Sequence, residues 1–203
     1  MKKIWLVLLI LVLSLNVMAC GDDKANETEI DKVDEAGDNE KVDEIQIKGV
    51  IAEEVEKYGN LNEFETMTFD DKIFDQDDFS DYDITMINIW GTFCGPCIKE
   101  LPELAELAKE IPENVNLIGL CTDYSGNEEY AKKLLSDVDA EYTNIVLSPE
   151  LQNSFAKNIQ YVPTTVFVDS KGNIIGRIKV GAPAGDVKEA YMKLIEEALE
   201  AIK

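Results

Sequence analysis

The sequence predicts an α/β fold, because short apolar runs alternate along the chain with segments that repeat apolar residues at helical spacing. The runs are rich in Val, Ile and Leu and have the length of buried strands, whereas the segments between them are amphipathic. Gly, Asn and Asp gather between these segments, as they do in turns. Strands that alternate with helices in this way build a sheet covered by helices.

The predicted elements follow one another over residues 65–202. The segment 170–173 contains Gly172 and separates two apolar runs, so it predicts a hairpin turn. Asp186 precedes an amphipathic stretch and is expected to cap the last helix. Strands are predicted at residues 65–68, 85–90, 115–121, 144–147, 165–168 and 174–180, helices at 98–110, 127–137, 150–157 and 187–202, and a short turn at 77–82.

Two cysteines, Cys94 and Cys97, lie where the apolar run 85–90 passes into the helix predicted at 98–110. A C-x-x-C pair can close a disulfide and reopen it by thiol–disulfide exchange. At a helix N-terminus the first backbone N–H groups are unpaired and the helix dipole is positive, which favours a thiolate. The alternatives are a structural disulfide or half of a zinc site, but zinc needs two more ligands and the chain has no histidine. The motif therefore predicts a redox-active pair.

Two segments carry a resemblance to a known family. Residues Trp90–Pro102, WGTFCGPCIKELP, and Tyr161–Thr165, YVPTT, resemble the thioredoxin superfamily. More narrowly, they are similar to the TlpA/ResA-like branch of extracytoplasmic thiol–disulfide oxidoreductases, and the similarity covers residues 62–203. The resemblance implies a thioredoxin-like fold with a central mixed β-sheet flanked by helices. It also implies an inserted helix–strand–helix segment before the loop that contains Pro163.

The resemblance assigns catalytic roles to three residues. Cys94 matches the exposed cysteine that attacks the substrate, Cys97 matches the buried resolving cysteine, and Glu100 matches a carboxylate that this branch carries. From the residues alone, Glu100 lies one helical turn past Cys97, so it can share a helix face with that thiol and accept its proton. The alternative is one more solvated glutamate on a helix that carries three others.

The resemblance also assigns a substrate-binding surface. Pro163 matches a proline with a cis peptide bond that lies against the disulfide. The backbone of Val162 and Pro163 is expected to hold the substrate chain extended, as in strand addition. Trp90 and Phe93 are expected to add apolar surface beside it, with Phe93 standing where Trp is more usual.

The first 19 residues have the pattern of an export signal. Two lysines precede the apolar stretch Ile4–Leu15, which is shorter than the roughly 20 residues of a membrane-spanning helix. Residues 17–20, VMAC, resemble a bacterial lipobox, which implies cleavage before Cys20 and attachment of lipid to its sulfur. The alternative is ordinary cleavage after Ala19, and both place the rest of the chain outside the cytoplasm, where disulfides persist.

Residues 20–59 are expected to form an acidic tether, and residues 60–203 the folded domain. Most of the tether is rich in Asp, Glu, Lys and Asn and has too few large apolar side chains to offset its chain entropy. The formal net charge of the chain is −22, which argues against nucleic acid and against electrostatic adhesion to anionic lipid. Attachment to a membrane would therefore be covalent.

Cys121 ends the apolar run 115–121 and is left without a predicted role. A buried free cysteine behaves as a small apolar residue, and this is the expectation here. The alternative is a third redox thiol, which requires exposure or a partner within disulfide reach.

With the resemblance included, the sequence predicts a lipid-anchored oxidoreductase on the outer face of a bacterial cell membrane. It is expected to reduce disulfides in proteins, in cytochrome c maturation or more generally, without a metal or organic cofactor, and to receive electrons from a CcdA-like membrane carrier. The alternatives are a disulfide-forming oxidant, a peroxide reductase and a redox-inactive binding lipoprotein. Gly95 and Pro96 between the cysteines favour reduction, and residues 87–94 lack the P-x-x-x-T-x-x-C pattern of peroxide-reducing enzymes.

Overall fold

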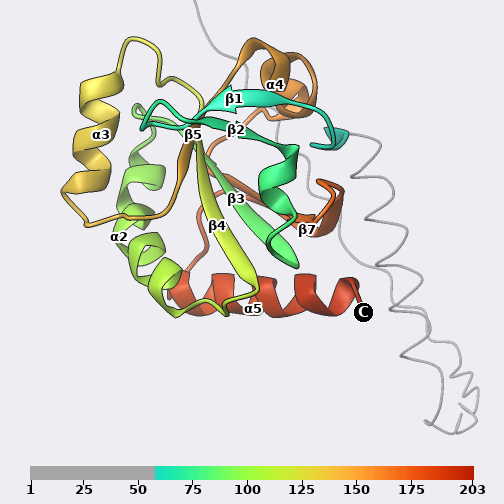
Figure 1. Cartoon of the computed structure of the whole chain (residues 1–203). Coiled ribbons are helices and arrows are strands. Elements are labelled where there is room, and N and C mark those ends of the chain that lie inside the picture. Colours follow the sequence, from blue (N-terminus) through green and yellow to red (C-terminus); the bar gives the residue numbers. More distant parts are fainter. Residues whose placement is uncertain (1–57) are drawn as a thin grey trace, which may run out of the picture. The chain divides into compact units, whose positions relative to one another are not determined.

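The computed structural model describes residues 58–203, which are organised around a five-stranded sheet with the order β5-β4-β3-β6-β7 (Figure 1). β4 runs parallel to β3 and β5, whereas β6 runs antiparallel to β3 and β7. The predicted central mixed sheet is therefore confirmed. The strands are β3 Ile84–Trp90, β4 Val115–Cys121, β5 Asn144–Val146, β6 Thr164–Asp169 and β7 Ile174–Val180.

Helices α2, Gly95–Glu110, and α5, Val187–Ala201, cover one face of this sheet. Asp186 caps α5 as predicted, because its side chain accepts a hydrogen bond of 2.9 Å from the Glu189 N–H. The helices α3, Glu128–Ser136, and α4, Pro149–Asn153, flank β5 in the chain and form the predicted helix–strand–helix insertion. The core between the sheet, α2 and α5 consists of Ile84, Met86, Leu104, Leu107, Val115, Leu117, Phe167, Tyr191, Ile195 and Ala198.

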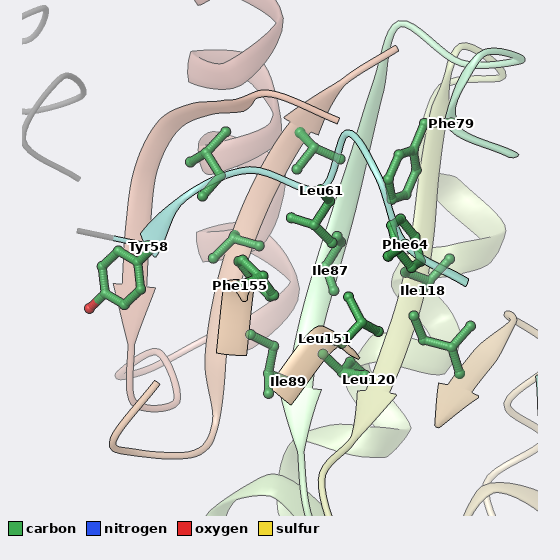
Figure 2. Packing of buried hydrophobic residues seen from close by; sticks show 14 of the residues in the cluster. Tyr58, Leu61, Phe64, Phe79, Ile87, Ile89, Ile118, Leu120, Leu151 and Phe155 are labelled. Carbon is green, nitrogen blue, oxygen red and sulfur yellow. The ribbon is translucent and has the colours of Figure 1, made fainter. Parts of the chain in front are cut away.

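The opposite face is covered by the hairpin of β1, Glu65–Met67, and β2, Ile73–Asp75, together with α4 and two 3₁₀ turns, η1 (Gln76–Phe79) and η2 (Phe155–Asn158). Because β3 is covered on both faces, all seven of its residues are buried, which explains why most of them are apolar. Figure 2 shows the side chains that meet on this face, among them Leu61, Phe64, Phe79, Ile87, Ile89, Ile118, Leu120, Leu151 and Phe155.

Two elements differ from the prediction. The helix expected at 150–157 is interrupted at Ser154, whose φ of −104° and ψ of −97° are not helical, and whose hydroxyl donates to the Glu150 carbonyl at 2.8 Å. This break turns Phe155 into the core, where it is fully buried. β2 was not predicted, because only Phe74 of its three residues is buried and so short a strand shows no alternation.

Most of the N-terminal predictions lie outside the described residues. These are the signal peptide at 1–19, the lipidation site Cys20 and the tether at 20–59 except for its last two residues. Tyr58, the first described residue, is buried in the core with Leu61, so the folded part reaches back at least to residue 58. Within 58–203, no helix is both long enough and apolar enough to cross a membrane.

Candidate active site

Cys94 lies at the junction between the sheet and α2, four residues after the end of β3. It is the N-cap of α2, and its sulfur accepts a hydrogen bond of 3.2 Å from the Cys97 N–H. Pro96 occupies the first turn, where a missing N–H has no consequence for the helix. Cys94 and Cys97 are joined by a disulfide bond. The N-terminus of α2 thus supplies the N–H group that would stabilise a Cys94 thiolate after reduction.

The two cysteines differ less in exposure than the resemblance implies. Cys97 is fully buried as expected, but Cys94 is only 6% exposed. In the disulfide its sulfur is bonded to Cys97 and lies 3.4 Å from the carbonyl oxygen of Val162, so the neighbouring loop covers most of it. Cys94 remains the more accessible sulfur of the pair, at the edge of the apolar cluster that also contains Trp90 and Cys121.

The loop beside the disulfide contains the cis peptide bond between Val162 and Pro163, as the resemblance implies. The Pro163 carbonyl accepts a hydrogen bond of 2.8 Å from the Gly181 N–H at the end of β7. The Thr164 hydroxyl donates to the Tyr161 carbonyl at 2.8 Å. These bonds fix the backbone of the loop against the sheet, so the Val162 carbonyl is held next to the Cys94 sulfur.

Trp90 and Phe93 lie in opposite environments. Phe93 is 72% exposed next to Cys94, in agreement with its expected place on the substrate surface. Trp90 has no exposed surface, and its indole N–H donates to Asn144 Oδ1 at 3.0 Å. Its expected contact with substrate is wrong, because β3 is covered on both faces and its last side chain points into the core. Tyr161, which directly precedes Val162 in the loop, is 68% exposed and was not singled out by the sequence reasoning.

Glu100 is 2% exposed, so the alternative of a solvated surface glutamate is wrong. Asn88 Nδ2 donates to its Oε1 at 2.9 Å, and the Tyr191 hydroxyl donates to its Oε2 at 3.3 Å. Burial raises the pKa of the Glu100 carboxyl above its ordinary value of 4.5, and the bonds from Asn88 and Tyr191 and the charge of Lys179 oppose that rise. A buried carboxyl one turn along α2 from Cys97 is thereby brought toward the range in which it can exchange protons near neutral pH.

Asp123 holds the loop before Cys94 and was missed by the sequence reasoning. Its carboxylate accepts hydrogen bonds from the Thr92 N–H at 2.8 Å and from the Thr92 hydroxyl at 2.6 Å. Thr122 adds a hydroxyl bond of 3.0 Å to the Trp90 carbonyl. The only signal in the sequence was an Asp shortly after the end of a buried strand. Which loop it would contact depends on β3 and β4 being neighbours.

Cys121 is a buried free cysteine at the end of β4, beside β3 as predicted. Its thiol lies 3.5 Å from Asp123 Oδ1, and burial raises its pKa to about 12. A thiol that stays protonated at neutral pH is a poor nucleophile. Cys121 therefore fits the apolar role rather than that of a third redox thiol. Within residues 58–203, no group of three or more Cys, Asp or Glu is placed to hold a metal ion.

Comparison with known proteins agrees with this geometry, since the model of the Redoxin family matches residues 55–194. The chain belongs to the Redoxin family. Among curated Redoxin-like relatives, the chain is 36% identical over 133 residues to the thiol:disulfide interchange protein DsbE of Haemophilus influenzae, covering 64% of each chain. It is 30% identical over 112 residues to the thiol-disulfide oxidoreductase ResA of Halalkalibacterium halodurans, covering 54% of this chain and 61% of that one. The matches therefore span less than two thirds of these relatives.

Solved structures show the same fold. A thioredoxin family thiol:disulfide interchange protein from Chlorobium tepidum superposes with a TM-score of 0.58 at 22% identity, covering 68% of this chain and 93% of that one. A secreted disulfide oxidoreductase from Mycobacterium tuberculosis gives a TM-score of 0.55 at 18% identity, covering 66% and 96%. The thioredoxin-like fold of this Redoxin family member is thus confirmed.

Proposed function

We propose that this protein is an extracytoplasmic thiol–disulfide oxidoreductase that reduces disulfides in proteins through Cys94 and Cys97. The observation that carries the proposal is the place of the Cys94 sulfur. It accepts an N–H bond of 3.2 Å at the start of α2 and lies 3.4 Å from the Val162 carbonyl, next to the cis bond before Pro163. The sulfur therefore stands between a group that stabilises a thiolate and backbone on which a substrate chain can lie.

The reaction begins with the reduced pair. The Cys94 thiolate attacks one sulfur of the substrate disulfide, forming a mixed disulfide and expelling the other sulfur as a thiolate that takes a proton from water. The Cys97 thiol then gives its proton to the Glu100 carboxylate and attacks the Cys94 sulfur. The bond between Cys94 and the substrate breaks, and the second substrate sulfur leaves as a thiolate that takes up the proton released by Glu100, which returns to its carboxylate form. The substrate gains two electrons and two protons, and the Cys94–Cys97 disulfide is formed.

Substrate binding is assigned to the surface around Cys94. The Val162–Pro163 backbone would hold an extended segment of the substrate, and the exposed ring of Phe93, next to Cys94 in the chain, would pack on it. Trp90 takes no part in this contact, because it is buried. A protein in which an accessible disulfide is flanked by extended, apolar chain fits this surface.

The reducing direction and the place in the cell rest on the sequence. Gly95 and Pro96 between the cysteines favour a reductase over an oxidant, and the family resemblance supports electron supply by a CcdA-like membrane carrier and a task such as cytochrome c maturation. Lipid at Cys20 would hold the domain on the outer face of the membrane. The names of DsbE and ResA among the relatives are consistent with thiol–disulfide exchange.

The first test is the reduction potential of the Cys94–Cys97 pair, measured on the full chain with Cys20→Ser by equilibration with dithiothreitol. A potential near that of thioredoxin, about −270 mV or lower, is expected for a reductase. A potential near about −120 mV would identify an oxidant and reverse the proposed direction of electron flow. Cys121→Ala serves as the control, since a buried thiol outside the pair should not change the titration.

Two further experiments test the exchange and the anchor. Reduced Cys97→Ser should form a stable mixed disulfide with insulin, whereas Cys94→Ser should form none, because only Cys94 is placed to attack. The opposite result would exchange the roles of the two cysteines. Cells fed an alkyne fatty acid should label the wild-type protein but not Cys20→Ser; equal labelling of both would refute lipidation at Cys20.

A further inference from the structure

The carboxylate of Glu100 belongs to a closed ring of hydrogen bonds that joins four elements. Asn88 on β3 donates to Glu100 Oε1 at 2.9 Å and to Thr165 Oγ1 at 3.3 Å. The Thr165 hydroxyl on β6 donates to the Tyr191 hydroxyl oxygen at 3.1 Å, and Tyr191 on α5 donates to Glu100 Oε2 at 3.3 Å. Both oxygens of Glu100 accept, which is the arrangement of an ionised carboxyl.

We infer that Tyr191 is a positioning residue for the transfer of a proton from Cys97 to Glu100. Its hydroxyl fixes one oxygen of the carboxylate and stabilises the ionised form that accepts the proton. Tyr191 has no exposed surface and packs in the core between the sheet, α2 and α5, so its hydroxyl cannot turn toward water. The inference deepens the proposed function and rests on the proton-acceptor role assigned there to Glu100.

The pKa of Glu100 is set by several opposing effects, and the hydrogen bond from the Tyr191 hydroxyl is one of those that lower it. Burial raises the pKa of the carboxyl, and the hydrogen bonds from Asn88 and Tyr191 lower it, as does the positive charge of Lys179 on β7. Lys179 acts from a distance, because its ammonium group donates to the Val180 and Gly181 carbonyls. Without the hydrogen bond from Tyr191, the upward effect of burial on the Glu100 pKa would be opposed less strongly, so this pKa would rise further.

The ring of hydrogen bonds is also connected to the loop that contains the cis bond before Pro163. Thr165, which orients the Tyr191 hydroxyl, lies two residues after Pro163 on the strand that continues the loop with the cis bond. Asn88, which bonds both Thr165 and Glu100, lies two residues before the end of the strand that leads to Cys94. The proton acceptor is therefore anchored to the two backbone segments that carry the reacting sulfur and the substrate-binding carbonyl.

A second tyrosine provides a matched control. Tyr142 precedes β5, and its hydroxyl is buried near Glu100 and Tyr191. That hydroxyl has no hydrogen-bond partner among the described residues. Tyr142→Phe and Tyr191→Phe each remove one buried hydroxyl and keep the ring, but only the second removes a bond to Glu100.

The test follows the two thiol steps separately in the full chain with Cys20→Ser. The reduced protein is mixed with dithiobis(nitrobenzoate) in a stopped-flow instrument from about pH 4 to about pH 9, a range that spans the ordinary carboxyl and thiol pKa values. The first release of nitrothiobenzoate reports attack by Cys94, and the second reports attack by Cys97 on the mixed disulfide. Cys121, whose pKa is raised to about 12 by burial, does not compete.

The expected result is a selective shift of the second release. In Tyr191→Phe, the acid limb of the pH–rate profile for the second release should move to higher pH by about one unit. This is the shift expected when one hydrogen bond to a carboxylate is lost. The first release should keep its pH profile, and Tyr142→Phe should coincide with the wild type in both. Carbon-13 NMR of labelled glutamate side chains, with Glu100 assigned by Glu100→Gln, should show the same upward shift of its pKa in Tyr191→Phe.

Three outcomes would overturn the inference. In the first, folded Tyr191→Phe has the wild-type acid limb; in the second, Tyr142→Phe shifts the limb as far as Tyr191→Phe. In the third, Glu100→Gln leaves the acid limb unchanged, which removes the proton-acceptor role while thiol exchange continues. A wild-type protein that shows no second release would instead contradict the proposed use of Cys97, so the two failures are distinguishable.

A second pair of variants covers the case in which Tyr191→Phe does not fold. Thr165→Val removes the hydroxyl that orients Tyr191 and keeps the side-chain volume, so a smaller shift in the same direction is expected. Thr165→Ser keeps the hydroxyl and should restore the wild-type limb. Equal profiles for the Val and Ser variants would refute the role of the ring.

Discussion

The bond between Trp90 and Asn144, which holds the end of β3 just before the redox motif, depends on the absence of a side chain at residue 119. Asn88, Gly119 and Asn144 are partners across β3, β4 and β5. Asn144 Oδ1 accepts the Trp90 indole N–H at 3.0 Å directly over Gly119. A Cβ atom at residue 119 would collide with the Asn144 amide and lie 3.1 Å from the indole nitrogen.

Gly119→Ala should therefore destabilise the fold by two effects. Displacing the Asn144 amide leaves the buried indole N–H of Trp90 without a partner, which costs about 1–3 kcal/mol. Forcing a methyl group into a packed layer costs about 1–3 kcal/mol more. The free energy of unfolding should fall by about 2–6 kcal/mol in total.

The assay is urea unfolding of the oxidised full chain, followed by circular dichroism, on Gly119→Ala, Asn144→Ala and the double variant. Asn144→Ala removes the group with which the new methyl collides, so the double variant should be less destabilised than the sum of the single variants. Gly95→Ala is the control, since a Cβ there meets no atom within 4 Å. A loss below about 1 kcal/mol for Gly119→Ala, or additivity within about 0.5 kcal/mol, would refute the reasoning.

Three other predictions concern the site and the core. Glu100→Gln should gain stability relative to the wild type as pH rises from about 4.5. The pKa of Glu100 is raised in the folded state, so ionisation of the buried carboxyl lowers the stability of the wild type, whereas the neutral amide of Gln does not ionise. A difference in unfolding free energy between the two proteins that does not grow with pH would contradict this. Thr92→Val should cost about 1.5–3 kcal/mol through loss of the 2.6 Å bond to Asp123, whereas Thr92→Ser should stay near the wild type; equal urea midpoints would argue against the bond. Phe79→Ala should cost about 3–5 kcal/mol, since Phe79 is fully buried against Phe64, and thermal unfolding that matches the wild type would show that the cluster does not support the sheet.

The elements that could be predicted were those with a local signal. β3 and β4 are largely apolar because both faces of the central strands are covered. α5 shows a helical repeat and a capping Asp at its start. The interruption at Ser154 and the short strand β2 could not be predicted, because each depends on a side chain, Phe155 or Phe74, that packs against residues distant in the chain.

The candidate site divides in the same way. The positions of Cys94 and Cys97 at a strand-to-helix junction follow from the sequence, because the motif and its flanking pattern are contiguous. The burial of Trp90 and the contact between Asp123 and Thr92 do not, since they arise from the pairing of strands that are separated in the chain. The exposure of a side chain in particular depends on all the elements that pack around it, so a local motif does not predict it.

The sequence by itself determined the chemistry of this protein, which is two cysteines in C-x-x-C spacing at a helix N-terminus. The proline-containing loop beside them was expected only from the family resemblance. Only the tertiary structure decided the environment that controls that chemistry. Without the family resemblance, nothing in the sequence distinguishes the environment of Glu100 from that of the other glutamates on its helix. That environment is formed when β3, β6 and α5 bring Asn88, Thr165 and Tyr191 around it. The physical reason is that burial and hydrogen bonding set a pKa, and both are made by residues that meet only when the chain folds.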